Sequence, residues 1–418
     1  MRSGLIILVA ALATLQGCAC DTVPSGAVTS CEATQVLPAA VETDILLVID
    51  DSLSMAEEQV NLHDNLAAFI DALAASPVSN HFRIGVTSTS VAAFGATTTT
   101  GLSYGGGPSR GVPYPAGALV AIEQDATGAG VTGKLLYDPV ASPATGGWWG
   151  PRILDQGSPT LARDFKANVL LGTSGSGKEQ PWRAARLALS DRLADANAGF
   201  LRPGARLAVI FLTDEDDCSD TLAPFAGTND ACHAMATKDA APPILDTPEE
   251  LAAFLKGPID GEQREVMVGA IAGLDPVTLA PSCSDPALCS DTACSTAFDK
   301  GDRFVRLQAA LGSDLMRLGS ICDASFKDTL TRFAVALMPS TLPLQGTPAD
   351  WRMLVVTVVR ADGTTVGCGV AAAGTPGQGG ADAVYTPPGF GQPAQLAFQN
   401  RCTLGLGDRI DVRVVCAN

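Results

Sequence analysis

The spacing of apolar residues divides the first part of the chain into alternating strands and a helix. The apolar, β-branched run at residues 45–49 indicates a buried strand, and residues 82–89 indicate a second one. Between these strands, apolar residues recur at three- and four-residue steps, which predicts an amphipathic helix that ends before Pro77. The order strand, helix, strand predicts a right-handed crossover and a parallel or mixed sheet.

The same alternation continues along most of the chain. Residues 206–213 form the clearest central strand, and residues 266–272 indicate another buried strand. The apolar spacing predicts helices at 161–169, 179–194, 247–256, 303–318 and 326–337. Residues 247–250 (Thr-Pro-Glu-Glu) form a capping box with proline at the first helical position. We therefore expect an α/β fold with a doubly wound, mostly parallel central sheet flanked by helices.

Three regions depart from this pattern. Residues 90–160 lose all periodicity and are rich in Gly, Pro and Thr, which predicts a long insertion over the sheet. Residues 282–295 form a cysteine-rich excursion. After Pro339, antiparallel strands are indicated by alternating patterns at 353–360, 395–399 and 409–415. We therefore expect an α/β domain at 42–340 and a small antiparallel β module at 341–418.

The first seventeen residues have the pattern of a signal peptide. Arg2 precedes an apolar region at 5–15 that is too short to span a bilayer. This region ends in Leu15-Gln16-Gly17-Cys18, which resembles the lipobox of bacterial lipoproteins. The resemblance implies cleavage before Cys18 and lipidation of that residue, with 18–41 as a tether; the alternative is an ordinary secretory signal with a chance cysteine. Because position 19 is not Asp, the resemblance also implies an outer-membrane address.

Net charge and length narrow the class of protein. The formal charge of −17 argues against nucleic acid, which requires a basic face, and against direct adsorption on anionic lipid. The 418 residues are enough for a full α/β core and a second module. We therefore expect an exported protein that the lipid on Cys18 anchors to the membrane.

Twelve cysteines are typical of an exported protein. If Cys18 is acylated, eleven remain, so one thiol is free or pairs with another chain. Cys218 and Cys232, and Cys402 and Cys416, are close enough in sequence to form local disulfides, each worth about 3 kcal/mol. We also expect disulfides among four further cysteines: Cys283, Cys289, Cys294 and Cys322. The alternative for this group is a zinc site, although its spacing lacks a CxxC pair.

Two separate central strands each end in an aspartate. The strand at 45–49 is followed by Asp50, Ser52 and Ser54, and the strand at 206–213 by Asp214. Neighbouring strand ends lie about 5 Å apart, so both can face one ion. Carboxylate and hydroxyl oxygens suit Mg²⁺, Mn²⁺ or Ca²⁺ better than zinc or copper. The alternative is that a serine only caps the following helix and the acids are solvated.

The stretch Asp50-Asp51-Ser52-Leu53-Ser54 resembles the DxSxS signature of von Willebrand factor type A domains, the fold that also forms integrin I domains. The lipobox, the loop 172–179, the stretch 200–219 and the final β module resemble the bacterial lipoprotein branch of this family. The likeness spans about 42–340. It implies that Asp50, Ser52 and Ser54 are metal ligands, and that Asp214 contacts the ion directly or through water.

The resemblance also implies a metal-binding threonine in the middle loop. We assign this role to Thr173, because it lies in the loop before the helix predicted at 179. In the family this threonine is closer to an Ala-Leu pair, and Glu179 occupies roughly that place. Glu179 is therefore the alternative, and its added charge would shift the preference toward Ca²⁺.

The predicted donors imply a mode of action. Two serines, one threonine and one or two aspartates would leave an octahedral Mg²⁺ ion with one open or water-filled position. A Glu or Asp from a partner protein can complete the shell. We therefore expect a divalent-cation-dependent protein-binding or adhesion lipoprotein that is not an enzyme. The alternatives are an envelope protein whose metal only stabilises the fold and an enzyme whose chemistry lies in the insertion.

Three motifs resemble a nucleotide-binding, a hydrolase and a calcium-binding sequence, but the residues around each do not fit that function. Residues 172–178 nearly match a phosphate-binding P-loop, but Glu179 stands where Ser or Thr is needed. Residues 101–105 fit the nucleophile elbow of serine hydrolases, but no apolar strand precedes them. The acidic run at 214–217 is followed by Cys218 and lacks the glycine of an EF-hand. We therefore expect no nucleotide as a partner.

Overall fold

The structure is a computed structural model, and the parts of the chain that it describes contain all the elements discussed below. The described residues are 34–35, 41–91, 103–105, 113–124, 130–136, 148–173, 175–220, 240, 243–339, 341–344, 347–348, 350–389 and 393–414. The predicted signal peptide and Cys18, Cys232 and Cys416 lie outside them. Within the described ranges, no helix combines the length and the apolar character that crossing a membrane requires.

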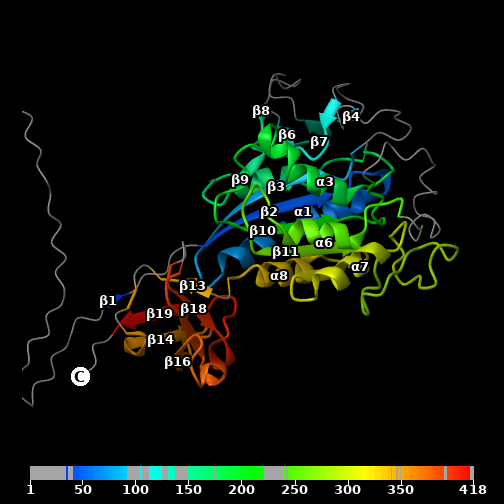
Figure 1. The fold of residues 1–418 in the computed structure, drawn as a ribbon. Coiled ribbons are helices and arrows are strands. Elements are labelled where there is room, and N and C mark those ends of the chain that lie inside the picture. The colour runs from blue at the N-terminus through cyan, green and yellow to red at the C-terminus, as the bar shows by residue number, and fades with distance from the viewer. Residues whose placement is uncertain are drawn as a thin grey trace, which may run out of the picture.

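Six strands form the central sheet in the order β12-β11-β10-β2-β3-β9, and Figure 1 labels the five from β11 to β9. Their bounds are Val41–Ile49 (β2), Asn80–Ser88 (β3), Ile153–Asp155 (β9), Arg206–Leu212 (β10), Val266–Ala272 (β11) and Met316–Ser320 (β12). All neighbours are parallel except β3 and β9, which are antiparallel. Because β3 and β10 lie on opposite sides of β2, the strand order reverses at β2. The predicted doubly wound, mostly parallel sheet is thus confirmed.

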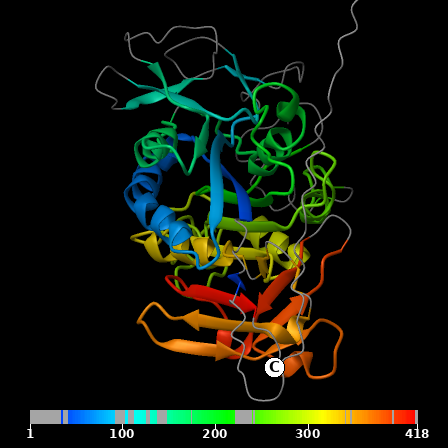
Figure 2. The same ribbon diagram turned by 90° about the vertical axis from the view of Figure 1, so that its left-hand side faces the viewer.

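Helices cover both faces of this sheet (Figure 2). One layer contains α1 (Ala56–Ala74), α2 (Leu161–Asn168) and α8 (Lys327–Ala336), and the other contains α3 (Pro181–Ala188), α6 (Pro248–Lys256) and α7 (Asp302–Leu311). Successive residues of β2 serve the two layers in turn: Ile45 and Leu47 pack in the first core, and Leu46 and Val48 in the second. This double burial explains why the strand is a continuous apolar run.

Local sequence signals set the boundaries of several helices. The capping box of α6 is present, since the Thr247 hydroxyl accepts from the Glu250 N–H and the Glu250 carboxylate accepts from the Thr247 N–H. The prediction of one helix at 303–318 is wrong. Gly312, at φ 97°, ends α7 after Leu311, and the following residues enter β12. The predicted helix at 179–194 is also divided, into α3 and the short 3₁₀ helix Asp191–Ala194.

The predicted insertion contains short antiparallel strands. Strands β4 (Ser103–Gly105) and β5 (Pro113–Pro115) pair, and a second small sheet has the order β7-β6-β8, with bounds Gly130–Leu136, Ala121–Gln124 and Trp148–Trp149. The chain then returns to the main sheet as β9. Strands of two to four residues are too short to produce a periodic apolar signal, which is why the sequence did not indicate most of them.

The C-terminal strands form two further sheets, below the α/β body in Figure 1. Their orders are β1-β19-β14-β15 and β13-β18-β17-β16, and all pairs are antiparallel except β16–β17. The bounds are Thr34–Gln35 (β1), Thr341–Pro343 (β13), Leu354–Val359 (β14), Thr365–Cys368 (β15), Val370–Ala372 (β16), Ala383–Thr386 (β17), Gln395–Phe398 (β18) and Arg409–Val414 (β19). The predicted antiparallel module is confirmed. Strand β1 belongs to the predicted tether, so part of that segment pairs with this module.

The cysteine-rich excursion is held by disulfides, as predicted. Cys283 bonds to Cys289 and Cys294 to Cys322, which leaves none of these four thiolates for zinc. Cys218 is also disulfide-bonded. Its predicted partner, Cys232, lies outside the described ranges, so this pairing stays a prediction.

One predicted disulfide is wrong. Cys402 bonds to Cys368 and not to Cys416. Cys402 ends the short helix Asn400–Cys402, which packs beside β15, and β19 then carries the chain away along β14. Proximity in sequence does not decide which strand a cysteine faces. The partner of Cys402 is therefore set by the fold, and it is Cys368 although Cys416 is nearer in sequence.

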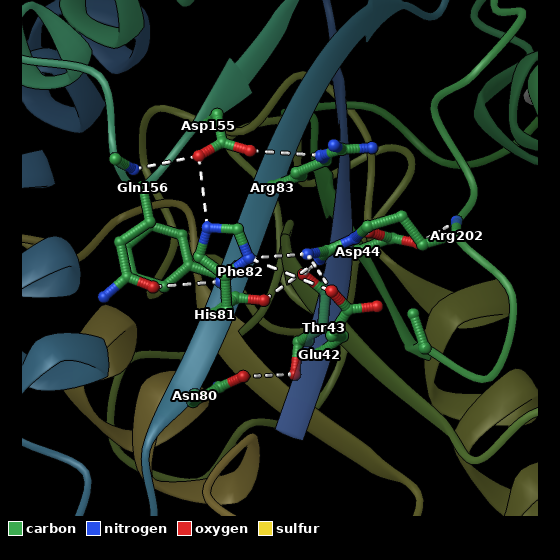
Figure 3. A network of polar contacts seen from close by, with 12 residues as sticks. Glu42, Thr43, Asp44, Asn80, His81, Phe82, Arg83, Asp155, Gln156 and Arg202 are labelled. Atoms are coloured by element: carbon green, nitrogen blue, oxygen red, sulfur yellow. Dashed lines mark hydrogen bonds and ion pairs between the residues drawn. The ribbon is translucent and has the colours of Figure 1, made fainter. Parts of the chain in front are cut away.

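A polar network around the buried Asp44 and Arg202 lies at the amino-terminal end of the sheet (Figure 3). At its centre, the Arg202 Nε donates to Asp44 Oδ1 and the Arg202 backbone N–H to Asp44 Oδ2, both at 2.7 Å. The remaining guanidinium N–H groups bind the carbonyls of Thr43 and His81 at 2.9 and 3.0 Å and the Glu42 carboxylate at 3.2 Å. Burial raises the pKa of Asp44, and the hydrogen bonds and charge of Arg202 oppose this rise.

The same network attaches the edge strand β9. Asp155 of β9 accepts hydrogen bonds from Arg83 Nε at 3.2 Å and lies 3.1 Å from His81 Nε2 (Figure 3). Since β9 pairs with β3 over only three residues, these side-chain contacts add to a short ladder. The polar contacts at the amino-terminal end of the sheet thus stabilise the attachment of β9.

Candidate metal-binding site

The two predicted strand-end acids lie next to each other at the carboxyl edge of the sheet. Ile49 of β2 is paired with Leu212 of β10, and the Asp50 N–H donates to the Leu212 carbonyl at 2.9 Å. Asp50 and Asp214 therefore leave neighbouring strands at the same edge. This edge is also where the strand order reverses, the position at which open α/β sheets bind their ligands.

Asp50 is fully buried and held at both carboxylate oxygens. Its Oδ1 accepts from the Ser52 N–H at 2.8 Å, and its Oδ2 accepts from the Thr213 hydroxyl at 2.7 Å. Thr213 was not predicted as part of the site. Its place directly before Asp214 was the only signal in the sequence.

The two serines connect this loop to the second acid. Ser52 Oγ lies 3.2 Å from Ser54 Oγ, and Ser54 Oγ donates to Asp214 Oδ1 at 3.2 Å. The other oxygen of Asp214, Oδ2, is buried and has no hydrogen-bond partner in the described part of the chain. The structure therefore brings together Asp50, Ser52, Ser54 and Asp214, four of the predicted ligands.

Two glutamates join this group of acids. Burial raises the pKa of Glu179 well above its usual range, and the charges of Glu215 and Asp50 raise it further. Burial and the Glu215 charge raise the pKa of Asp50 to about 7. Burial and the Asp50 charge raise the pKa of Asp214 to about 9. The carboxylates thus repel one another in a region from which water is largely excluded.

The structure places the alternative Glu179 among the other acids, whereas the Thr173 assignment stays a prediction. Thr173 is half-buried and, among the described residues, is hydrogen-bonded to none of the four other predicted ligands. Glu179 is fully buried just before α3, and its charge acts on the same cluster. The sequence could not separate the two because both lie in one loop.

Asp51, the variable position of the DxSxS motif, joins three loops. Its Oδ1 accepts from the Ser90 hydroxyl at 2.8 Å, and the same Ser90 oxygen accepts from the Ser176 N–H at 2.8 Å. The Gly175 N–H donates to the Asp51 carbonyl at 2.7 Å. Burial raises the pKa of Asp51 to about 7. Asp51 was not predicted, and its role is to hold the middle loop, and through it Glu179, against the first loop.

Gly175→Ala is expected to displace this middle loop. An added Cβ would lie 2.4 Å from the Asp51 Cγ and 2.5 Å from its backbone oxygen, so one of the two loops must move. We expect the free energy of unfolding in urea to fall by about 1–3 kcal/mol, and the affinity for Mn²⁺ in calorimetry to fall with it. Gly379→Ala is the control, because a Cβ there meets nothing within 4 Å. A Gly175→Ala protein with unchanged stability and affinity would contradict the contact.

The donors at this edge fit a hard divalent cation. Every predicted ligand offers oxygen, which Mg²⁺, Mn²⁺ and Ca²⁺ prefer. Asp214 Oδ2 is buried without a hydrogen-bond partner in the described part, and a dipositive ion there would satisfy it. The same ion would offset the repulsion among Asp50, Asp214 and Glu179. The residues that would hold it are Asp50, Ser52, Ser54 and Asp214, and the buried Glu179 adds its charge to the same cluster.

Fold and site together define an α/β protein with an oxygen-rich site at the switch point of a doubly wound sheet. No protein-family model matches the sequence, and no curated protein matches it. Solved structures that match this chain include a von Willebrand factor type A protein from Catenulispora acidiphila, with 12% identity over 90% of this chain and 58% of that chain, at a TM-score of 0.31.

Two pilus adhesins are similar at the same level. One is SpaC from Lactobacillus rhamnosus GG in its open conformation, with 11% identity over 91% of this chain and 39% of that chain, at a TM-score of 0.36. The other is RrgA from Streptococcus pneumoniae, with 12% identity, 90% and 56% coverage and a TM-score of 0.32. The chain thus spans about 39 to 58% of the length of these proteins. The solved structures that match this chain thus include a von Willebrand factor type A protein, the family that the DxSxS stretch resembles.

Proposed function

We propose that this protein binds a partner protein through a divalent cation, in an adhesion or protein-binding role. The observation that carries the proposal is the row of oxygens from Ser52 to Ser54 to Asp214, with 3.2 Å between neighbours and the fixed carboxylate of Asp50 beside it. Ser54 is exposed, so the row is open to the outside. The pilus adhesins share only the fold, and a binding role is in keeping with them.

The cation would supply a Lewis-acidic position that accepts a carboxylate. The chain's own residues do the rest. Asp50 is held by Ser52 and Thr213, so it needs little reorganisation to serve as a ligand. A Glu or Asp of the partner would complete the shell, which makes the contact specific for an acidic ligand.

A second candidate function is binding of a metal ion that only stabilises the fold. It is favoured by the complete burial of Asp50 and Glu179, whose repulsion a bound ion would relieve even without a partner. The two functions differ in what removal of the ion changes: partner capture in the first, and only the melting temperature in the second.

Capture in the presence and absence of chelator tests the first function. We expect immobilised protein to retain an envelope protein in Mg²⁺ and to release it in brief EDTA, because the ion forms part of the contact. Ser54→Ala, which removes one hydroxyl of the row, should weaken the capture in Mg²⁺. Unchanged capture in EDTA, together with a lower melting temperature, would support the stabilising role instead.

We further propose that the protein is exported and is anchored in the outer membrane by a lipid on Cys18. The support is the lipobox-like sequence at 15–18. Cys18→Ser is expected to move the protein from the membrane fraction to the soluble fraction, because one acylated residue would be its anchor. Cys20→Ser is the matched control and should stay with the membrane. A Cys18→Ser protein that remains acylated and membrane-bound would contradict the anchor.

A further inference from the structure

The loop that carries the predicted ligands also exposes a leucine. Leu53 lies between Ser52 and Ser54, and 82% of its surface is accessible. A single exposed apolar residue is ordinary on a protein surface. Its significance therefore depends on whether other apolar groups lie at the same place.

A second exposed apolar side chain lies beside the other acid. Phe298 is 45% accessible, and its N–H donates to the Asp214 carbonyl at 2.9 Å. The next N–H, of Asp299, donates to the same carbonyl at 3.1 Å. Ser54 is hydrogen-bonded to the Asp214 side chain, so the segments that carry Leu53 and Phe298 both adjoin the row of oxygens.

Phe298 is kept in this position by the cysteine-rich excursion. The segment has no helix or strand of its own between β11 and α7. It is closed by Cys283–Cys289, tied to the loop after β12 by Cys294–Cys322, and tied to the end of β11 by the Ser282 N–H, which donates to the Gly273 carbonyl at 3.0 Å. These bonds hold an exposed aromatic residue against the site, where it can form part of a binding surface.

An acidic groove of about 400 Å³ adjoins this surface. It lies between the first turns of α1 and the loop that follows β12, and its charged lining residues are all acids: Glu57, Glu58, Asp64 and Asp323. Its wall is fixed, because Asn61 Nδ2 donates to the Asp323 carbonyl at 3.0 Å and Asn61 Oδ1 accepts from the Phe326 N–H at 3.2 Å. Such a groove favours a positively charged group.

The groove is lined by the segments that lead away from the proposed ion position. Glu57 follows Ser54 by three residues, and Thr296, which also lines the groove, precedes Phe298 by two. Glu58 is 6% accessible and its Oε2 has no hydrogen-bond partner in the described part of the chain. A single ligand segment can therefore contact both features.

We propose that the partner presents a short segment that combines an acidic, an apolar and a basic residue. This inference rests on the proposed cation-dependent function. An acidic residue of the segment contacts the ion, a neighbouring apolar side chain packs on Leu53 and Phe298, and a nearby Lys or Arg enters the acidic groove. The apolar contact and the basic contact provide the specificity that a carboxylate alone would lack.

Selection from a display library of random peptides tests this composition without a known partner. The mature protein is used as bait in Mn²⁺, bound clones are eluted with EDTA, and the enriched sequences are read. We expect an Asp or Glu next to Leu, Ile, Val or Phe, with Lys or Arg within a few residues. Leu53→Ser should remove the apolar preference and weaken a selected peptide about tenfold. Glu57→Gln combined with Asp64→Asn should remove the basic preference.

Controls separate this inference from the function beneath it. Val277→Ser alters an apolar residue that is 89% accessible and belongs to neither the ligand loop nor the groove, and it should select the same peptides as the unaltered protein. Calorimetry with Mn²⁺ is run on every bait and should show equal affinity. If the unaltered protein binds no Mn²⁺, the proposed function is contradicted and this inference falls with it. If Mn²⁺ binds but the EDTA-eluted peptides lack the apolar and basic residues, or none are eluted, the inference alone is overturned.

Discussion

Asp50→Ala is expected to abolish binding of Mg²⁺ and Mn²⁺ while the protein remains folded. Asp50 supplies a buried carboxylate fixed by Ser52 and Thr213, and a site of this kind depends on its charged oxygens for affinity. The fold should persist because removing Asp50 also removes one of the charges that act on Asp214 and Glu179. We expect calorimetry to show at least about a hundredfold loss of affinity, and circular dichroism to show an unchanged secondary structure.

Asp50→Asn refines this test, because asparagine keeps the shape of the side chain and can still accept from Thr213. If charge is what matters, the asparagine variant should bind Mn²⁺ nearly as poorly as the alanine variant. Asp362→Asn, in a turn of the C-terminal module, is the matched control and should bind normally. An unchanged ion affinity in both Asp50 variants would rule out the site.

Arg202→Met is expected to lower the free energy of unfolding by about 3–5 kcal/mol at neutral pH. Arg202 is 7% accessible and Asp44 is fully buried, so loss of the guanidinium leaves a carboxylate without its cation. The carbonyls of Thr43 and His81 lose their donors as well. Urea denaturation at pH 7 measures the effect.

The pH dependence of this loss identifies its cause. The pKa of Asp44 is already raised by burial, and removal of Arg202 takes away the charge and hydrogen bonds that lower it. The folded variant then holds a proton on Asp44 to a higher pH than the unfolded chain does. Stability of the variant must therefore fall as the pH rises through the pKa of the folded state, and the deficit should be smaller at pH 5 than at pH 8.

Two further variants act as controls for Arg202→Met. Asp44→Asn in the same chain should restore much of the stability, since no buried charge then remains. Arg352→Ala removes an exposed ion pair with Asp350, in which the Arg352 side chain is 71% accessible. This change should lower the free energy of unfolding by no more than about 1 kcal/mol. A deficit that is the same at every pH would show that the loss comes from packing and not from the Asp44 charge.

Some features of the site could not be predicted from the sequence because they depend on loops that meet only in the folded chain. Glu179 was only an alternative ligand in the sequence, and no local pattern marks Glu215 as part of the cluster or Asp51 as the residue that binds Ser90 and Gly175. Their proximity follows from the crossing of three loops, with Gly175 close against Asp51. The exposed Phe298 is likewise placed by hydrogen bonds to Asp214, far away in sequence.

The sequence by itself determined the strands β2, β3, β10 and β11 and the edge at which Asp50, Ser52, Ser54 and Asp214 meet. A strand buried on both faces must be continuously apolar, and its end is marked wherever polar residues begin, so this information is local. Only the tertiary structure decided that Cys402 bonds to Cys368, that β12 replaces the end of a predicted helix, and that Glu179 joins the acids. These outcomes depend on which distant segments come into contact, and short-range spacing along the chain does not specify that.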